Sequence, residues 1–202
     1  MIKHFKIKYP KASETKQAIM DRIGIRCTGY LAGVPNEYDS GHKSSWYFHN
    51  EEKDVQEICD VITWIESVAI PNAAHIFSLN TKKYDPAKYN NIMDTTGYPA
   101  IGGGEYGFDM KQFRITECWA NIFNDNEGVR PHNHFPYTMS FAYYVNLPEG
   151  SANIMLDGES VPTEEGECII FPSNIEHQVP PNTTINRMAI IGNVLYVKSG
   201  LS

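Results

Sequence analysis

The sequence predicts a mainly β protein with flanking helices, built as an all-β barrel or sandwich with helical segments in front of it. Two observations lead to this prediction. From residue 112 onward, short runs rich in β-forming residues alternate with turn sequences such as LPEG, LDGE and FPSN. Before them, the segment Asp54–Ala69 has the apolar period of a helix. A core helix that braces a β-barrel accounts for both halves.

Length and composition are those of one ordinary globular domain, which we expect to span residues 1–202. The net charge of -7 argues against nucleic acid as the main partner. No apolar run approaches the roughly 18 residues of a membrane span, and the first residues lack the apolar core of a secretory signal. The four cysteines form no CxxC motif, which indicates buried free thiols in a reducing compartment. We therefore expect a cytoplasmic protein.

Residues 1–111 are expected to support the β core. The pattern predicts a short helix over Ser13–Ile23, with Ser13 as its cap and its end at Gly24. It predicts a longer helix over Asp54–Ala69, which ends because of Pro71. The apolar stripe of this second helix is expected to pack on a sheet and consists of Val55, Ile58, Cys59, Ile62 and Ile65.

The segment Asn80–Gly107 is rich in Tyr, Asn, Lys and Gly and carries three glycines in a row at 102–104. We expect neither helix nor strand there. Long irregular loops often serve as lids or binding loops, and this segment is the candidate for such a lid, with an inert loop as the alternative.

The β core is expected over residues 112–197. Turn residues separate its predicted strands. These strands are Gln112–Phe123, Arg130–His134, Thr138–Asn146, Ala152–Leu156, Glu167–Phe171, His177–Val179 and Asn186–Tyr196.

The run RPHNHFPY contains two histidines, His132 and His134, two residues apart in a predicted strand. Side chains two apart on a strand point to the same side, so both can converge on one point inside a barrel. A third, His177, follows 43 residues after His134 at the start of a later strand. Three imidazoles that converge form a facial metal site, suited to Fe, Zn, Cu or Ni. The alternative is that these histidines only satisfy local hydrogen bonds.

Three further runs, HNHFPYTMSFAYYVNLPEG, EGECIIFPSNIEHQVPPNTTINR and IIGNV, give the region 112–197 a specific order of motifs. In this order it resembles the iron(II)- and 2-oxoglutarate-dependent oxygenases. The nearest match is the prolyl-hydroxylase-like branch, in the group of such oxygenases found in bacteria and phages. The resemblance implies a double-stranded β-helix core of the jelly-roll or cupin-like type, with N-terminal helices packed on its major sheet.

The resemblance also implies a metal site. His132 matches the first iron ligand and His177 the last, whereas His134 stands where most of the family has Asp or Glu. The implied cofactor is Fe(II), with 2-oxoglutarate and O2 as co-substrates. A third imidazole in place of a carboxylate leaves the iron with one more unit of positive charge. If His134 does not ligate the metal, water fills its position.

Four residues match positions that bind the co-substrate. Arg187 matches the arginine that pairs with the distal carboxylate of 2-oxoglutarate, and a cation entering the apolar run MAII needs such a partner. Tyr144 matches a tyrosine that touches the same carboxylate. Asn121 and Asn193 lie where residues often border the co-substrate, although either can instead satisfy backbone groups.

The implied function is a 2-oxoglutarate-dependent dioxygenase that couples oxidative decarboxylation of the co-substrate to hydroxylation of a substrate. By analogy alone, that substrate is a prolyl residue of a peptide or protein. Trp119 and Tyr137, close to the histidine pair in sequence, are candidates to line the substrate entrance or to pack in the core. One alternative is a three-His cupin-type metalloenzyme without 2-oxoglutarate, in which Arg187 binds a substrate carboxylate. The other is a metal-free β-barrel binding module.

Overall fold

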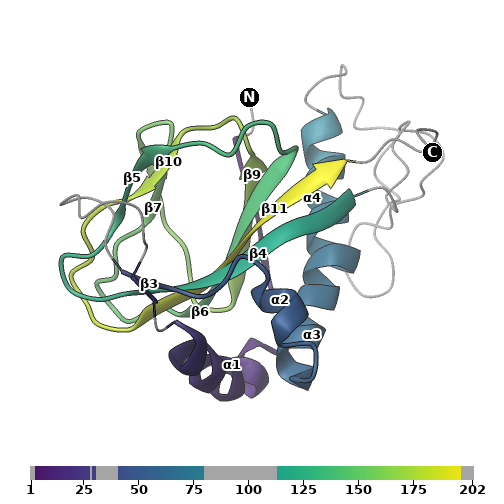
Figure 1. The fold of residues 1–202 in the computed structure, drawn as a ribbon. Coiled ribbons are helices and arrows are strands. Elements are labelled where there is room, and N and C mark those ends of the chain that lie inside the picture. Colours follow the sequence, from purple (N-terminus) through teal and green to yellow (C-terminus); the bar gives the residue numbers. More distant parts are fainter. Residues whose placement is uncertain (1–2, 28, 31–40, 80–112, 197–202) are drawn as a thin grey trace.

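The structure is a computed structural model that describes residues 3–27, 29–30, 41–79 and 113–196. Two sheets of antiparallel strand pairs face each other, and helices cover the outer face of the larger one, as Figure 1 shows. The architecture is therefore mainly β with flanking helices, in agreement with the sequence prediction. The segment 80–107, the candidate lid, lies outside the described residues. None of the helices in the described ranges is long and apolar enough to cross a membrane.

The larger sheet has seven strands, and β11 lies at its centre between β4 and β6. Alternate residues of β11 serve two cores, because strand side chains alternate between faces. Met188 and Ile190 pack in the cluster shared with the helices, whereas Ala189 belongs to the cluster between the two sheets. In sheet order the strands are β1 (Phe5–Lys8), β9 (Glu167–Pro172), β6 (Met139–Asn146), β11 (Arg187–Tyr196), β4 (Phe113–Phe123), β3 (His42–Lys43) and β2 (Gly29–Tyr30).

The smaller sheet has four short strands. In sheet order they are β5 (Val129–His132), β10 (His177–Val179), β7 (Ile154–Leu156) and β8 (Glu159–Val161). The antiparallel register of β5 and β10 makes His132 and His177 direct partners. Residues of β7 and β8 pack against Ala142, Tyr144 and Phe171 of the larger sheet, which closes the interior.

The helices lie on the far side of the larger sheet in Figure 1. The helical residues Ile23, Ile58 and Ile65 are fully buried in the cluster that also contains Ile190. The helical elements are α1 (Ala12–Arg26), α2 (Phe48–Glu51), α3 (Gln56–Trp64), the π-helical turn η1 (Ile65–Ala69) and α4 (Ile70–Leu79).

Both predicted helices exist, but the residues predicted to begin or end them were wrong. Pro71 does not end the second helix. The π-helical turn η1 precedes it, in which the N–H of Ile70 donates to the carbonyl of Ile65, and the chain then continues through Pro71 as α4. The first helix is not capped by Ser13, since it begins at Ala12 without a side-chain cap. It also runs through Gly24, because burial of its apolar residues outweighs the roughly 1 kcal/mol cost of a helical glycine.

Each predicted strand of the core has a counterpart among the described strands. The prediction was wrong at one place that matters for the site: β5 ends at His132, so His134 lies beyond it. The short strands β1, β2, β3 and β8 were missed. The cysteines are free thiols, and those at 27, 118 and 168 are buried as expected.

Candidate metal centre

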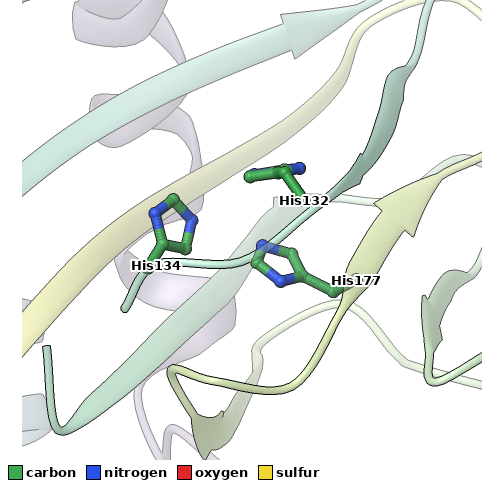
Figure 2. A group of neighbouring side chains, drawn as sticks. All are labelled: His132, His134 and His177. Atoms are coloured by element: carbon green, nitrogen blue, oxygen red, sulfur yellow. The ribbon is translucent and has the colours of Figure 1, made fainter. Parts of the chain in front are cut away.

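Three histidines come together between the two sheets. His132 ends β5, His177 begins β10, and His134 lies two residues beyond β5. One ring nitrogen of each lies within 4.8 Å of the others. The ring centroids are 4.3 Å apart for His132 and His177, 5.0 Å for His132 and His134, and 4.9 Å for His134 and His177. Figure 2 shows the three rings converging on one point.

The backbone orients two of these rings. Nδ1 of His132 lies 2.8 Å from the carbonyl oxygen of Arg130, and Nδ1 of His177 lies 3.2 Å from that of Ile175. Only a protonated Nδ1 can donate to a carbonyl, so Nε2 of each ring keeps its lone pair for a ligand. His134 is held through its main chain, because its N–H donates to the carbonyl of Ser173 at 2.8 Å.

The surroundings keep the imidazoles of His134 and His177 neutral. Burial, assisted by His132, lowers the pKa of His177 to about 3, against the opposing hydrogen bond with Ile175. Burial, assisted by His132 and Lys43, lowers the pKa of His134 to about 4. A neutral imidazole is the form that binds a metal ion, so at neutral pH the metal does not have to displace protons from these rings. The chemistry of this donor set therefore fits a divalent metal ion.

Arg187 lies in the same interior, at the start of β11, and is only 2% exposed. Its Nε donates to the carbonyl of Ala152 at 3.2 Å, and no carboxylate within the described ranges forms an ion pair with it. Burial lowers its pKa, against the raising effect of Tyr144. A buried guanidinium without a counter-ion is costly, and a carboxylate that accepts two hydrogen bonds is its natural partner.

One cavity of about 560 Å³ joins these groups. The three histidines and Arg187 line it, and so do Tyr144, Asn121 and Trp119. The hydroxyl of Tyr144 and the side-chain oxygen of Asn121 are buried without a hydrogen-bond partner among the described residues. Unsatisfied buried polar atoms of this kind are rare and are expected where a ligand supplies the missing partner.

Two predicted site residues are placed elsewhere. Asn193 is not among the residues that line the cavity, and its side chain is fully engaged. Its amide donates to Glu117 at 2.9 Å and its oxygen accepts from Ser140 at 3.0 Å. The Ser140 hydroxyl in turn lies 2.8 Å from that of Ser173. Tyr137 also does not line the cavity, and its N–H donates to the carbonyl of His134.

The structure adds a residue that sequence reasoning missed. Lys43, on the two-residue strand β3, lines the cavity because its strand pairs with β4 and makes it the partner of Asn121. Trp46 follows it at the same wall. No sequence motif marks this stretch, and a two-residue strand gives no periodic signal.

Comparison with known proteins identifies the fold of this chain. No protein-family model and no curated protein matches the sequence. Among solved structures, the non-haem α-ketoglutarate-dependent epimerase SnoN from nogalamycin biosynthesis matches with a TM-score of 0.58 and 10% identity, over 98% of this chain and 82% of that one. The viral collagen prolyl hydroxylase of Paramecium bursaria Chlorella virus-1, solved with 2-oxoglutarate, matches with a TM-score of 0.54 and 12% identity, over 97% of both chains.

The chain has the fold of the 2-oxoglutarate and iron(II) oxygenases. A further oxidoreductase of that family, from Burkholderia pseudomallei, matches over 43% of this chain and 45% of its own length, at 13% identity and a TM-score of 0.40. The structural similarity to SnoN and to the viral hydroxylase establishes the oxygenase fold. Because the sequence identities are low, the chemistry depends on the residues in the cavity.

Proposed function

We propose that this protein is a non-haem iron(II) dioxygenase that uses 2-oxoglutarate and O2 to hydroxylate a substrate. One observation carries the proposal. Three imidazoles whose ring nitrogens lie within 4.8 Å of one another share a cavity with a buried guanidinium for which no described carboxylate is a partner. A dicarboxylic co-substrate that chelates a metal at one end and pairs with an arginine at the other satisfies both groups.

The residues of the chain take separate roles. His132, His134 and His177 hold the iron. Arg187 binds the distal carboxylate of 2-oxoglutarate, and the unpartnered hydroxyl of Tyr144 donates to that same carboxylate. Asn121 borders the co-substrate from β4. The bound iron and co-substrate supply the oxidative chemistry, in which 2-oxoglutarate is decarboxylated to succinate and one oxygen atom enters the substrate.

Charge balance favours this pairing. Three neutral imidazoles leave iron(II) with its full double positive charge, and 2-oxoglutarate brings two negative charges into the cavity. Most of the wall around them is apolar, with Phe171 packed 4.8 Å from the ring of His177 and Trp119 5.8 Å from that of His134. These side chains keep water away from the metal, and Trp119 lies where a substrate approaches it.

We further propose a prolyl residue of a peptide or protein as the substrate, because the viral structure with the same fold is a collagen prolyl hydroxylase. Residues 1–202 would act as one oxygenase domain. We place its activity in the cytoplasm, since its thiols are free and a reducing compartment keeps them so.

The decisive experiment is anaerobic addition of iron(II) and then 2-oxoglutarate to the metal-free protein. The expected result is the weak visible charge-transfer band of a chelated 2-oxo acid. The band should vanish in His132→Ala and should need at least tenfold more 2-oxoglutarate in Arg187→Met, because a charge-assisted hydrogen bond is lost.

Matched controls are His4→Ala, which lies before β1, and Arg114→Met, which is exposed on β4. Neither residue lines the cavity, so both should behave like the wild type. Iron binding without a band would favour the three-His metalloenzyme that does not use 2-oxoglutarate, an outcome that His134 in place of a carboxylate makes worth testing. Absence of metal binding would overturn the proposal altogether.

A further inference from the structure

The cavity has an unusual charge pattern for an acidic chain. Its described lining contains three cationic side chains, Lys43, Arg130 and Arg187, and neither Asp nor Glu, although the chain as a whole carries a net charge of -7. Arg187 is assigned above to the distal carboxylate of 2-oxoglutarate. Lys43 is therefore a second cationic group of this lining that the co-substrate assignment does not use.

Lys43 lies on a different part of this wall from Arg187. Its strand partner is Asn121, whereas Arg187 is the partner of Phe123 on the other edge of the same β4 strand. The Nζ of Lys43 lies 4.6 Å from the centre of the Trp119 ring, and that ring centre lies 5.8 Å from the centre of the His134 ring, so the ammonium is on the His134 side of the metal centre. Lys43 and Arg187 can therefore hold two different anionic groups.

Two indole rings hold the Lys43 side chain. Its Nζ lies 2.7 Å from the centre of the Trp46 ring and 4.6 Å from that of Trp119. The two rings themselves pack edge to face with centroids 4.6 Å apart. Contacts of a cation with aromatic faces stabilise and orient an ammonium, but they leave its charge without a counter-ion.

No described residue supplies that counter-ion. The ion pairs of the described residues do not include Lys43, and no described group accepts a hydrogen bond from it. Glu117 is near enough to favour the charged lysine, but it forms no ion pair with Lys43. Burial lowers the pKa of Lys43 and so disfavours its ammonium in the free protein, and an anion from outside the chain would stabilise the charged form.

We propose that Lys43, held between Trp46 and Trp119, is a second anion subsite that binds a carboxylate of the primary substrate. This inference rests on the proposed function, because it needs Arg187 to be occupied by the co-substrate. The subsite narrows the substrate class to acids. A substrate whose carboxylate binds Lys43 would present a nearby carbon atom at the His134 side of the metal centre. The carboxylate belongs either to a chain terminus or free acid, or to an acidic side chain beside the reacting residue.

The test compares matched acid and amide probes on the protein loaded with iron(II) and saturating 2-oxoglutarate under nitrogen. The first pair is N-acetyl-L-proline and N-acetyl-L-prolinamide. The second pair is the peptides Ala-Pro-Glu-Ala and Ala-Pro-Gln-Ala, both with blocked ends. Binding is followed by tryptophan fluorescence, since two indoles flank the subsite.

The expected result is that the acid of at least one pair binds about tenfold more tightly than its amide, the effect of one charge-assisted hydrogen bond. The pair that shows the preference identifies the source of the carboxylate. The preference should disappear in Lys43→Met and persist in Lys43→Arg, which keeps the charge. It should also persist in Lys8→Met, a control on the exposed part of β1.

Equal binding of acid and amide in both pairs overturns the subsite, and so does a preference that survives in Lys43→Met. If Lys43→Met does not fold, the comparison of Lys43→Arg with Lys43→Gln decides the same question. The charge-transfer band separates the two proposals. A normal band without acid preference overturns the subsite alone, whereas absence of the band overturns the assignment of 2-oxoglutarate and with it the premise of the subsite.

Discussion

The guanidinium carbon of Arg187 lies 5.2 Å from the centre of the Tyr144 ring, and both side chains are almost completely buried. The tyrosine hydroxyl forms no hydrogen bond of good geometry with a described residue, although it lies near enough to Arg187 to favour the charged guanidinium, and the arginine donates to one carbonyl. Two strong polar groups are thus buried side by side and incompletely satisfied. Such an arrangement is unfavourable in the free protein and becomes favourable only when a ligand occupies it.

Replacement of Arg187 by Met should therefore separate stability from ligand binding. Because the variant removes a buried and unpaired charge, we expect its metal-free form to unfold at higher urea, with a gain of about 1–3 kcal/mol. The same variant should lose 2-oxoglutarate binding. Urea unfolding followed by tryptophan fluorescence measures the first effect. A variant that is less stable than the wild type would show that the guanidinium already has a partner in the free protein.

Metal should stabilise the wild type and not His177→Ala. A ligand at 100 times its dissociation constant adds about 2.7 kcal/mol to the free energy of unfolding. We expect manganese(II), which does not react with oxygen, to raise the melting temperature of the wild type and of the control His4→Ala. An equal rise in His177→Ala would place the metal elsewhere.

The polar chain that contains Asn193 should act on the metal through His134. It ends at Ser173, whose carbonyl fixes the main chain of His134. Asn193→Leu is expected to weaken cobalt(II) binding several-fold. The control is Asn182→Leu, because Asn182 is also fully buried and hydrogen-bonded, but to Phe123 and Thr184.

Both asparagine variants should lose stability by about 1–3 kcal/mol, the cost of unsatisfied buried groups. Only Asn193→Leu should change the cobalt(II) spectrum and affinity. Equal affinities in the two variants would mean that Asn193 contributes to stability alone.

Stability should depend on pH through Lys43. Burial lowers the pKa of this lysine to about 7, against the raising effect of Glu117, whereas the ordinary value is 10.5. Between these values the unfolded chain binds more protons than the folded one, so stability rises with pH. We expect the metal-free wild type to gain stability from pH 7 to pH 9.5 relative to Lys43→Met. A constant difference between the two proteins over this range would contradict the prediction.

Gly128 lies where β5 meets β10, and an added Cβ would lie 2.5 Å from the carbonyl oxygen of Val179. A backbone atom cannot give way cheaply, so Gly128→Ala should move β5 away from β10 and separate His132 from His177. We expect a loss of about 1–3 kcal/mol and weaker cobalt(II) binding. Gly24→Ala is the control, because its Cβ meets nothing within 4 Å and helix propensity favours it.

The sequence was informative where its pattern is local. Alternation and turn residues predicted the strands of the core. The spacing of His132, His134 and His177 left a metal site as one of two possibilities, the resemblance favoured it, and the structure brings the three together, although His134 lies beyond the strand. Arg187 was singled out by the family resemblance, with the cost of a cation in an apolar strand as support, and the structure buries it at 2% exposure.

The remainder depended on contacts between distant segments. Pro71 was expected to end a helix. The π-helical turn before it accommodates the absence of an N–H at the proline, and such a turn has no sequence signature. Lys43 reaches the cavity only because a two-residue strand pairs with β4. Asn193 was matched to a position near the co-substrate, whereas the bonds to Glu117 and Ser140 could be known only from the packed sheet.

The pairing of His132 with His177 links metal binding to the stability of the smaller sheet. These residues join two neighbouring strands of only four and three residues, in the smaller of the two sheets. A metal ion bound to both acts as a cross-link across that sheet, and its binding energy becomes folding energy there. Without the metal, the strands of this sheet would separate more easily than those of the larger sheet. Under the proposed iron(II) assignment, loss of the metal would therefore make this sheet the part of the described structure most open to proteases.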